Sequence, residues 1–213
     1  MVCFAYQLHR LTLTFKLKYM KNKPLLMAIA VLFIATSSVA QVTGTFTDSR
    51  DGKAYKTVTI GTQTWMAENL NFNTNFSGNI NGTDSWCNTI DDMCVTYGRL
   101  YTYEAAKKYA CPSGWHLPSD ADWKTLIDFL GGEKIAGNKL KSTTAWKISE
   151  KDTAITNSSG FTALPGGWGQ EGMLNSKKVT FSFPGTEGCW WSSTPDPNSN
   201  IYYRCMSNHT CPN

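Results

Sequence analysis

The strongest helical pattern in the chain lies between residues 119 and 131. Ser119 is a favoured helix N-cap, and Asp120 and Asp122 fall in the first turn, where the helix dipole stabilises negative charge. Gly131 and the glycine after it are typical of a helix end. Four apolar residues between these signals have the spacing i, i+3, i+4 and i+7: Trp123, Leu126, Ile127 and Leu130. The pattern predicts a helix with one face against the core.

A shorter helix is predicted at residues 102–109. Glu104, Ala105 and Ala106 lie in this segment, which ends before Cys111 and Pro112. Beyond Gly137 the chain consists of short extended pieces separated by Gly, Pro, Asn and Ser, and no sustained helical period returns. The sequence therefore predicts two helices.

The segment before these helices has the alternation of β-strands. Lys56, Val58 and Ile60 alternate with threonines and Tyr55, turn signals stand at residues 51–52 and 61–62, and residues 62–66 resume an extended pattern. This arrangement predicts a β-hairpin. Residues 69–92 are dominated by Asn, Gly, Thr and Ser and read as a long polar loop. Strands followed by two helices and then by strand and loop indicate an α+β domain.

The N-terminal segment has the features of a secretory signal. Lys21 and Lys23 precede an apolar run at residues 25–36, and residues 38–40 form a small-x-small cleavage site. The run of twelve residues is shorter than the about 20 that a membrane span needs, so we expect no permanent membrane span. Met20 directly precedes the basic residues. We therefore interpret residues 1–19 as an over-extended start, residues 20–40 as the signal peptide and residues 41–213 as one mature domain.

Removal of this leader changes the charge of the protein. The five basic residues before Gln41 leave with it and no acidic residue does, so fifteen Lys and Arg remain against sixteen Asp and Glu. The mature net charge is then about −1 rather than the +4 of the full sequence. This balance lacks the basic surface of a nucleic-acid-binding protein, and we expect no nucleic-acid partner.

Six cysteines remain in the mature chain, and an even number in an exported protein favours disulfides. The alternative is a metal site, but the chain has no Cys-x-x-Cys pair, and His209 with Cys211 is a weak ligand pair. Cys87 and Cys94 would close a short loop. If residues 195–200 form a hairpin loop, Trp191 faces Tyr203 and Cys189 faces Cys205, at a Cα separation suited to a disulfide.

Six segments resemble one known family, the Fibrobacter succinogenes major paralogous domain. They are IGTQTWMAENL (60–70), YGRLYTYEAA (97–106), CPSGWHLPSDADW (111–123), NKLKSTTAW (138–146), GFTALPGGW (160–168) and WWSST (190–194). The family is similar to the C-type-lectin-like superfold, so the resemblance implies two helices against an irregular antiparallel sheet with long loops. The 111–123 block also resembles a block of formylglycine-generating enzymes, which share that superfold. A shared fold does not imply a shared activity.

The chain differs from the family at its C-terminal end. Family members continue past the segment that matches residues 201–206 and end with a strand that carries Val-Arg-Cys, so we expect the last strand to be missing here. With the other pairs assigned, Cys111 remains for Cys211, which takes the place of the family's terminal cysteine. The predicted disulfides are therefore Cys87–Cys94, Cys189–Cys205 and Cys111–Cys211.

The candidates for catalysis and for metal binding have simpler explanations. His116 precedes a helix cap and has no obvious nucleophile as a partner, so a packed or capping histidine is favoured. No cysteine pair of the formylglycine-generating type is found. Acidic and amide residues in two loops offer oxygen ligands of the kind calcium prefers, and calcium stays open as an alternative to solvated side chains. These residues are Asp91, Asp92, Asp196, Asn198 and Asn200.

Aromatic residues are the best candidates for binding. Trp190 and Trp191 are adjacent on a predicted strand, so one indole should face the core and the other should face outward. Trp168, which ends the GFTALPGGW block, is the third candidate. Trp65, Trp115, Trp123 and Trp146 fall inside apolar patterns and are assigned to the core.

We therefore expect a secreted, periplasmic or outer-surface protein that binds or adheres without catalysis, with no cofactor. A polysaccharide is the first ligand class to test, and a cell-surface partner is the second. The alternatives are a structural component of the cell envelope without a small ligand and, least supported, a formylglycine-generating-like enzyme.

Overall fold

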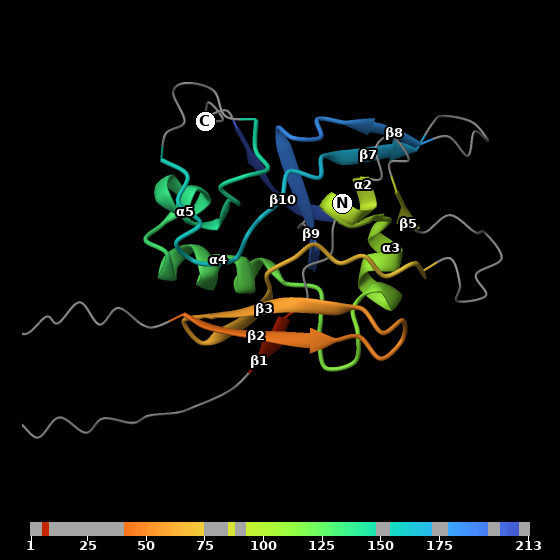
Figure 1. The fold of residues 1–213 in the computed structure, drawn as a ribbon, viewed down its shortest axis with the longest axis horizontal. Coiled ribbons are helices and arrows are strands. Elements are labelled where there is room, and N and C mark those ends of the chain that lie inside the picture. The colour runs from red at the N-terminus through yellow and green to blue at the C-terminus, as the bar shows by residue number, and fades with distance from the viewer. Residues whose placement is uncertain are drawn as a thin grey trace, which may run out of the picture.

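The computed structural model describes residues 6–8, 41–74, 85–87, 93–147, 154–171, 179–195 and 201–208. Within this part of the chain, strands and helices mix in an α+β architecture (Figure 1). The helices are α2 (Met93–Tyr97), α3 (Tyr103–Ala105), η3 (Ala106–Ala110), α4 (Asp120–Phe129) and α5 (Glu133–Leu140). The strands form one four-stranded sheet and three two-stranded sheets. None of the described helices is long and apolar enough to span a membrane.

The four-stranded sheet contains the predicted hairpin. Its order is β1-β4-β3-β2, with β1 (Tyr6–Leu8), β2 (Val42–Thr47), β3 (Ala54–Ile60) and β4 (Gln63–Met66), and all its pairs are antiparallel. Ile60 pairs with Gln63, so the turn between β3 and β4 has two residues, and the first is Gly61 with φ +61°. Glycine adopts this conformation without the cost that a side chain brings. The predicted hairpin is confirmed.

Helix α4 is the predicted core-facing helix and begins at the predicted cap. The Ser119 hydroxyl accepts a hydrogen bond from the backbone N–H of Asp122, and the Asp122 carboxylate accepts one from the backbone N–H of Ser119. This reciprocal capping box satisfies two donors that the first turn would otherwise leave unpaired. Trp123 and Leu126 are buried on the inner face, and Gly131 follows with φ +99°.

The prediction of only two helices was wrong. The segment 102–109 is helical, but only α3 is α-helical and the chain then widens into the π-helical η3. Helix α2 lies in a segment for which no helix was predicted. Helix α5 runs past Gly137, where extended structure was expected, and its apolar face is the short pair Ala136 and Leu140. A single apolar pair at i and i+4 is a weak periodic signal. The glycine between the two residues weakens the prediction further, because glycine disfavours helix interiors.

The remaining strands form three small antiparallel pairs. They are β5 (Ser85–Trp86) with β6 (Leu100–Tyr101), β7 (Trp168–Glu171) with β8 (Val179–Ser182), and β9 (Glu187–Pro195) with β10 (Ile201–Ser207). Strand β9 crosses the middle of the molecule, and the four-stranded sheet lies along one side with α4 next to it (Figure 1). In β9 and β10, Tyr203 pairs with Trp191 and Cys205 with Cys189, which is the predicted register.

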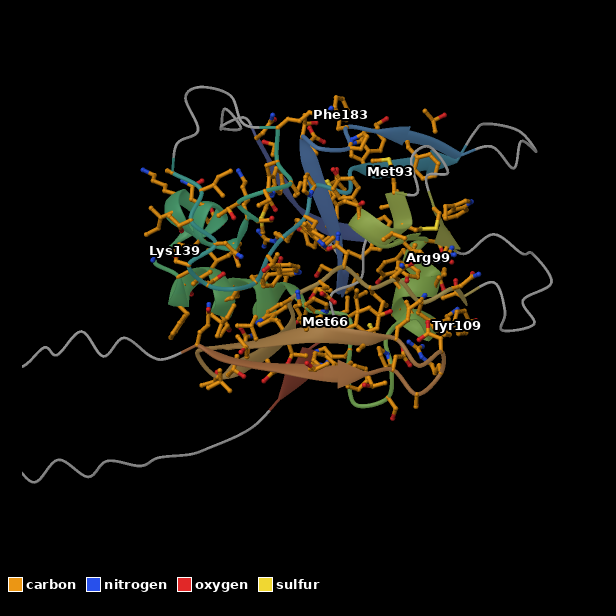
Figure 2. The ribbon with its side chains drawn as sticks, viewed as in Figure 1. Met66, Met93, Arg99, Tyr109, Lys139 and Phe183 are labelled. Carbon is orange, nitrogen blue, oxygen red and sulfur yellow. A yellow bond between two sulfur atoms is a disulfide. The ribbon has the colours of Figure 1, made fainter. Side chains whose placement is uncertain are left out.

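The core is centred on four aromatic rings from different elements. Trp65 of β4 contacts Trp123 of α4 and Phe161, with ring centroids 5.1 and 5.5 Å apart, and Trp123 also lies 6.3 Å from Trp190 of β9. Met66 joins this core beside the sheet (Figure 2). Because each ring brings a large apolar area, this cluster holds the sheet, α4 and β9 together.

Candidate binding surfaces

The two adjacent tryptophans of β9 have different environments. Trp190 is 1% exposed, and its indole N–H donates to Asn69 Oδ1 over 3.3 Å, so it belongs to the core. Of the two adjacent candidates, Trp190 is therefore the one that faces the core, and a ligand outside the protein cannot reach a side chain enclosed on all sides. Successive residues of a strand point to opposite faces, and Trp191 lies half-buried on the other face.

Trp191 is the centre of an aromatic surface, which we define as Tyr103, Trp191 and Tyr203. The Tyr103 and Tyr203 rings meet the Trp191 ring edge to face, with centroids 5.7 and 6.2 Å away. The Trp191 indole N–H donates to the backbone oxygen of Tyr101 over 2.8 Å. This bond and the edge-to-face contacts fix the orientation of the indole.

Large apolar side chains are exposed at the start of β10, next to the aromatic surface in the sequence. Ile201, Tyr202 and Tyr203 are consecutive and are 41%, 41% and 54% exposed. Lys107 lies over the Tyr103 ring, with its ammonium nitrogen 5.4 Å from the centroid, so one cation borders the aromatic surface. The surface therefore combines rigid rings with one positive charge.

Trp168 belongs to a second and smaller aromatic pair. Its ring lies 6.0 Å from that of Phe183, and its indole N–H donates to Glu187 Oε2 over 3.1 Å. Phe183 is 54% exposed and lies at the end of the molecule far from Met66 (Figure 2). The bond to Glu187 of β9 holds the Trp168 indole against the neighbouring β9–β10 sheet, so less of its polar edge is available to a ligand.

The structure also has a polar cleft that the sequence did not reveal. It encloses about 270 Å³ between the start of β3, the segment after β4, and α2. We define the polar cleft by its lining residues, which are Lys53, Ala54, Tyr55, Glu68, Asn69, Asn71, Cys94, Val95, Thr96, Gly98 and Leu164. They come from four separate parts of the sequence, and no local pattern links them. The volume is near the lower end for small-molecule sites.

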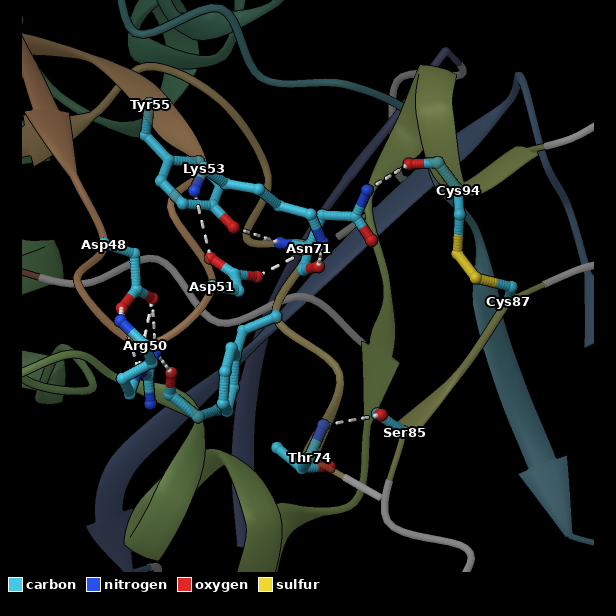
Figure 3. A network of polar contacts seen from close by, with 12 residues as sticks. Asp48, Arg50, Asp51, Lys53, Tyr55, Asn71, Thr74, Ser85, Cys87 and Cys94 are labelled. Carbon is cyan, nitrogen blue, oxygen red and sulfur yellow. Dashed lines mark hydrogen bonds and ion pairs between the residues drawn. A yellow bond between two sulfur atoms is a disulfide. The ribbon is translucent and has the colours of Figure 1, made fainter. Parts of the chain in front are cut away.

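Hydrogen bonds around Asn71 brace this polar cleft (Figure 3). The Asn71 side-chain N–H donates to the backbone oxygen of Cys94 over 3.0 Å, and its backbone N–H donates to the Tyr55 hydroxyl over 3.2 Å. The Lys53 ammonium donates to the Asn71 backbone oxygen over 2.5 Å and pairs with Asp51 at 3.3 Å. Burial raises the pKa of Tyr55 to about 12. The Tyr55 phenol in the cleft is therefore neutral at ordinary pH, and the Asp51 carboxylate balances the positive charge of Lys53.

Two disulfides lie beside these surfaces. The structure joins Cys87 to Cys94 at the wall of the polar cleft and Cys189 to Cys205 across β9 and β10, on the face of Trp191 and Tyr203. The Cys111 thiol lies 3.9 Å from the backbone oxygen of Ala106. Cys211 lies outside the described residues, so the Cys111–Cys211 bridge remains a prediction.

His116 lies beside the helix cap, as its position in the sequence suggested. Its Nε2 is 3.5 Å from Asp122 Oδ2, and the same oxygen accepts hydrogen bonds from the backbone N–H and the hydroxyl of Ser119. The Ser119 hydroxyl donates to the carboxylate and accepts from the Asp122 N–H. The Ser119 hydroxyl and the Asp122 carboxylate therefore both cap the N-terminal end of α4.

All five candidate calcium ligands lie outside the described residues. This holds for Asp91, Asp92, Asp196, Asn198 and Asn200. Among the residues that are described, no three His, Cys, Asp or Glu side chains gather to hold a metal. The calcium alternative therefore remains a prediction for these two loops.

Comparison with protein families gives a match over most of the chain. The model of a family described as the Fibrobacter succinogenes major domain matches residues 58–210. This span includes the aromatic surface and most of the polar cleft, while Lys53, Ala54 and Tyr55 precede it. Neither a curated protein nor a solved structure matches the chain at a significant level.

Proposed function

This chain belongs to the Fibrobacter succinogenes major domain family, and from that premise we propose that it is an exported, non-catalytic module that binds polysaccharide. The observation that carries the ligand class is the aromatic surface, with Tyr203 54% exposed against a fixed Trp191. A C-type-lectin-like fold, which the family resemblance implies, is part of the proposal.

The aromatic surface has the chemistry that sugar recognition needs. A sugar ring has apolar C–H faces and a polar edge, and tyrosine and tryptophan offer an apolar ring with one polar group. Their side chains have few rotatable bonds and lose little entropy when a ligand orders them. The contacts among Tyr103, Trp191 and Tyr203 already restrict these rings. This arrangement supports a weak site that contacts the apolar face of a sugar ring.

Export is supported by the cysteines. Disulfides form and persist in oxidising compartments, and both Cys87–Cys94 and Cys189–Cys205 are joined in the structure. The signal features at residues 21–40 agree with that compartment, and this segment lies outside the described residues. The non-catalytic part of the proposal is supported by the structural roles of Ser119, Asp122 and His116 at the start of α4.

The test is retention on immobilised polysaccharides from plant and bacterial cell walls. Tyr203→Ala should weaken retention by about tenfold or more, which corresponds to the loss of one contact of about 1.4 kcal/mol. Its thermal midpoint should stay near that of the wild type, since an exposed ring contributes little to the core. Tyr109→Ala is the matched control, because Tyr109 is 46% exposed outside the aromatic surface. Trp191→Ala is less informative, since this half-buried ring also packs against the core.

Two outcomes would contradict the proposal. Equal retention of the Tyr203 and Tyr109 variants would show that the aromatic surface is not the binding site. Trp168→Ala would then test the pair of Trp168 and Phe183. Failure of every polysaccharide to retain the wild type would favour the alternative, a structural component of the cell envelope without a small ligand.

A further inference from the structure

Strand β4 is a core strand with one weakly covered edge. Trp65 and Met66 are fully buried and Gln63 is 2% exposed. Among the described strands, one side of β4 pairs with the seven-residue β3, whereas the other side pairs with the three residues of β1. The sheet therefore depends on a short segment to satisfy the backbone groups along this edge.

The covering strand comes from the part of the chain that precedes the predicted cleavage site. Tyr6 pairs with Trp65, Gln7 with Thr64 and Leu8 with Gln63, whereas cleavage is expected after Ala40. With a start at Met20 or with cleavage after Ala40, β1 is not part of the exported domain. The outer edge of β4 would then lose its backbone pairing with β1 beside a buried apolar face, and an edge strand of this kind is a template for another strand.

We propose that the exported domain binds an extended strand of another polypeptide along the outer edge of β4, antiparallel and in the position of β1. The inference rests on the proposed export, but it does not depend on polysaccharide binding. Main-chain hydrogen bonds would supply most of the affinity, as in other cases of strand addition to a sheet edge.

The register defines the chemistry of the occupant. Directly paired residues of antiparallel strands lie on the same face of the sheet. Residues opposite Trp65 and Gln63 therefore share the face that the core covers, whereas a residue opposite Thr64 shares the outer face, where Thr64 bonds to Thr59. The occupant is then an apolar-polar-apolar segment, and Tyr-Gln-Leu at the β1 positions has this pattern.

The experiment uses the chain expressed from Met1, which contains β1, and compares variants in which β1 is disabled. One variant carries Gln7→Pro and Leu8→Pro together, because backbone N–H groups point alternately toward and away from a neighbouring strand and one of the two must face β4. The control variant carries Gln7→Ala and Leu8→Ala. The probe is a synthetic peptide of residues 4–10. A second peptide has the same sequence with proline in place of Gln7 and Leu8. Hydrogen exchange of the β4 amides and fluorescence anisotropy of the labelled peptide are measured.

We expect β4 amides of the double-proline variant to exchange faster than those of the control, and the probe to restore their protection. The probe should bind this variant at least about tenfold more tightly than the wild type, whose own β1 competes for the edge. The proline peptide should not bind. If the double-proline variant is unfolded alone, recovery of native tryptophan fluorescence with the probe supports the proposal.

Three results would overturn the inference. They are unchanged β4 exchange in the folded double-proline variant, equal binding of both peptides, and an unfolded variant that stays unfolded with saturating probe. Tyr203→Ala added to the double-proline variant should leave probe binding unchanged. Failure of polysaccharide binding is thereby distinguished from failure of strand addition.

Discussion

At the scale of single residues, the ion pair of Asp48 and Arg50 links the turn before β3 to the end of η3. Asp48 is fully buried, and its carboxylate accepts hydrogen bonds from the Arg50 guanidinium at 2.6 to 3.2 Å. The guanidinium also donates to the backbone oxygens of Tyr109 and Ala110 over 2.7 Å and lies 3.7 Å above the Phe72 ring. One side chain thus joins three separate segments.

Replacement of Arg50 should be strongly destabilising. Arg50→Ala leaves the Asp48 carboxylate buried without its cation, which typically costs about 3 to 5 kcal/mol of unfolding free energy. Urea denaturation followed by tryptophan fluorescence measures this loss. Lys108→Ala is the control, because the Lys108–Glu104 pair is exposed and its removal should leave the midpoint nearly unchanged. Similar midpoints for both variants would show that the Arg50 contacts do not support the fold.

Asp48 also predicts how the protein responds to acid. Burial raises the pKa of this carboxyl, but the hydrogen bonds and charge of Arg50 outweigh burial and hold the pKa below its usual 3.8. A lowered pKa in the folded state contributes stability above the unfolded value, and that contribution is lost as the pH falls through the folded value. Unfolding free energy should therefore drop below about pH 4. Asp48→Asn should flatten this part of the pH profile.

Tyr55 predicts how the stability of the protein responds to alkali. Burial raises its pKa to about 12 from the ordinary 10.0. The stability that comes from the neutral phenol is fully present below pH 10 and is lost as the pH rises through about 12. Thermal midpoints between pH 9 and pH 12 should fall more steeply for the wild type than for Tyr55→Phe. Parallel curves would indicate that the phenol is solvated.

At the scale of elements, the capping box of α4 sets the position of a helix that contacts both the sheet and β9. Ser119→Ala removes the hydroxyl that accepts from the Asp122 N–H, and loss of such a cap costs about 1 kcal/mol. Thr125→Ala is the matched control in the same helix. Thr125 is exposed and its hydroxyl donates to the Ala121 backbone oxygen one turn earlier, so its removal should be neutral or slightly stabilising. Chemical denaturation of both variants checks the difference.

The elements differ in how well their sequences predicted them. Helix α4 and the β3–β4 hairpin have complete local signals, a cap and an apolar stripe in one and a two-residue glycine turn in the other. Helix α5 has one buried apolar pair, and η3 departs from the α-helical period over Ala106–Ala110. Weak or irregular periods carry little information about an element, because tertiary packing rather than local preference stabilises it.

At the scale of the whole molecule, export and the third disulfide can be tested together. Intact mass of the protein recovered from the periplasm or medium should place its N-terminus at Gln41. Peptide mapping without reduction should join Cys111 to Cys211, beside the Cys87–Cys94 and Cys189–Cys205 pairs. A form that retains residues 21–40, or Cys111 bonded to Cys205, would contradict these assignments.

The sequence by itself determined the features whose partners are near in the chain. Ser119 and Asp122 are three residues apart, and Cys189 and Cys205 lie on neighbouring strands of one predicted hairpin, where they are paired in spite of a register shift between Ile201 and Tyr203. Such features depend on local geometry, which is similar in any fold that contains the element. The family resemblance likewise rests on short blocks, and the match over residues 58–210 bears it out.

Only the tertiary structure decided which of two adjacent tryptophans is buried, which groups Arg50 bonds and where the polar cleft lies. Trp190 is buried because Trp123 and Asn69 pack on its side of β9, and the cleft forms where segments around residues 53, 69, 95 and 164 meet. These arrangements depend on how elements far apart in sequence pack together. Alternation along a strand defines two faces, but it does not say which face the rest of the protein will cover.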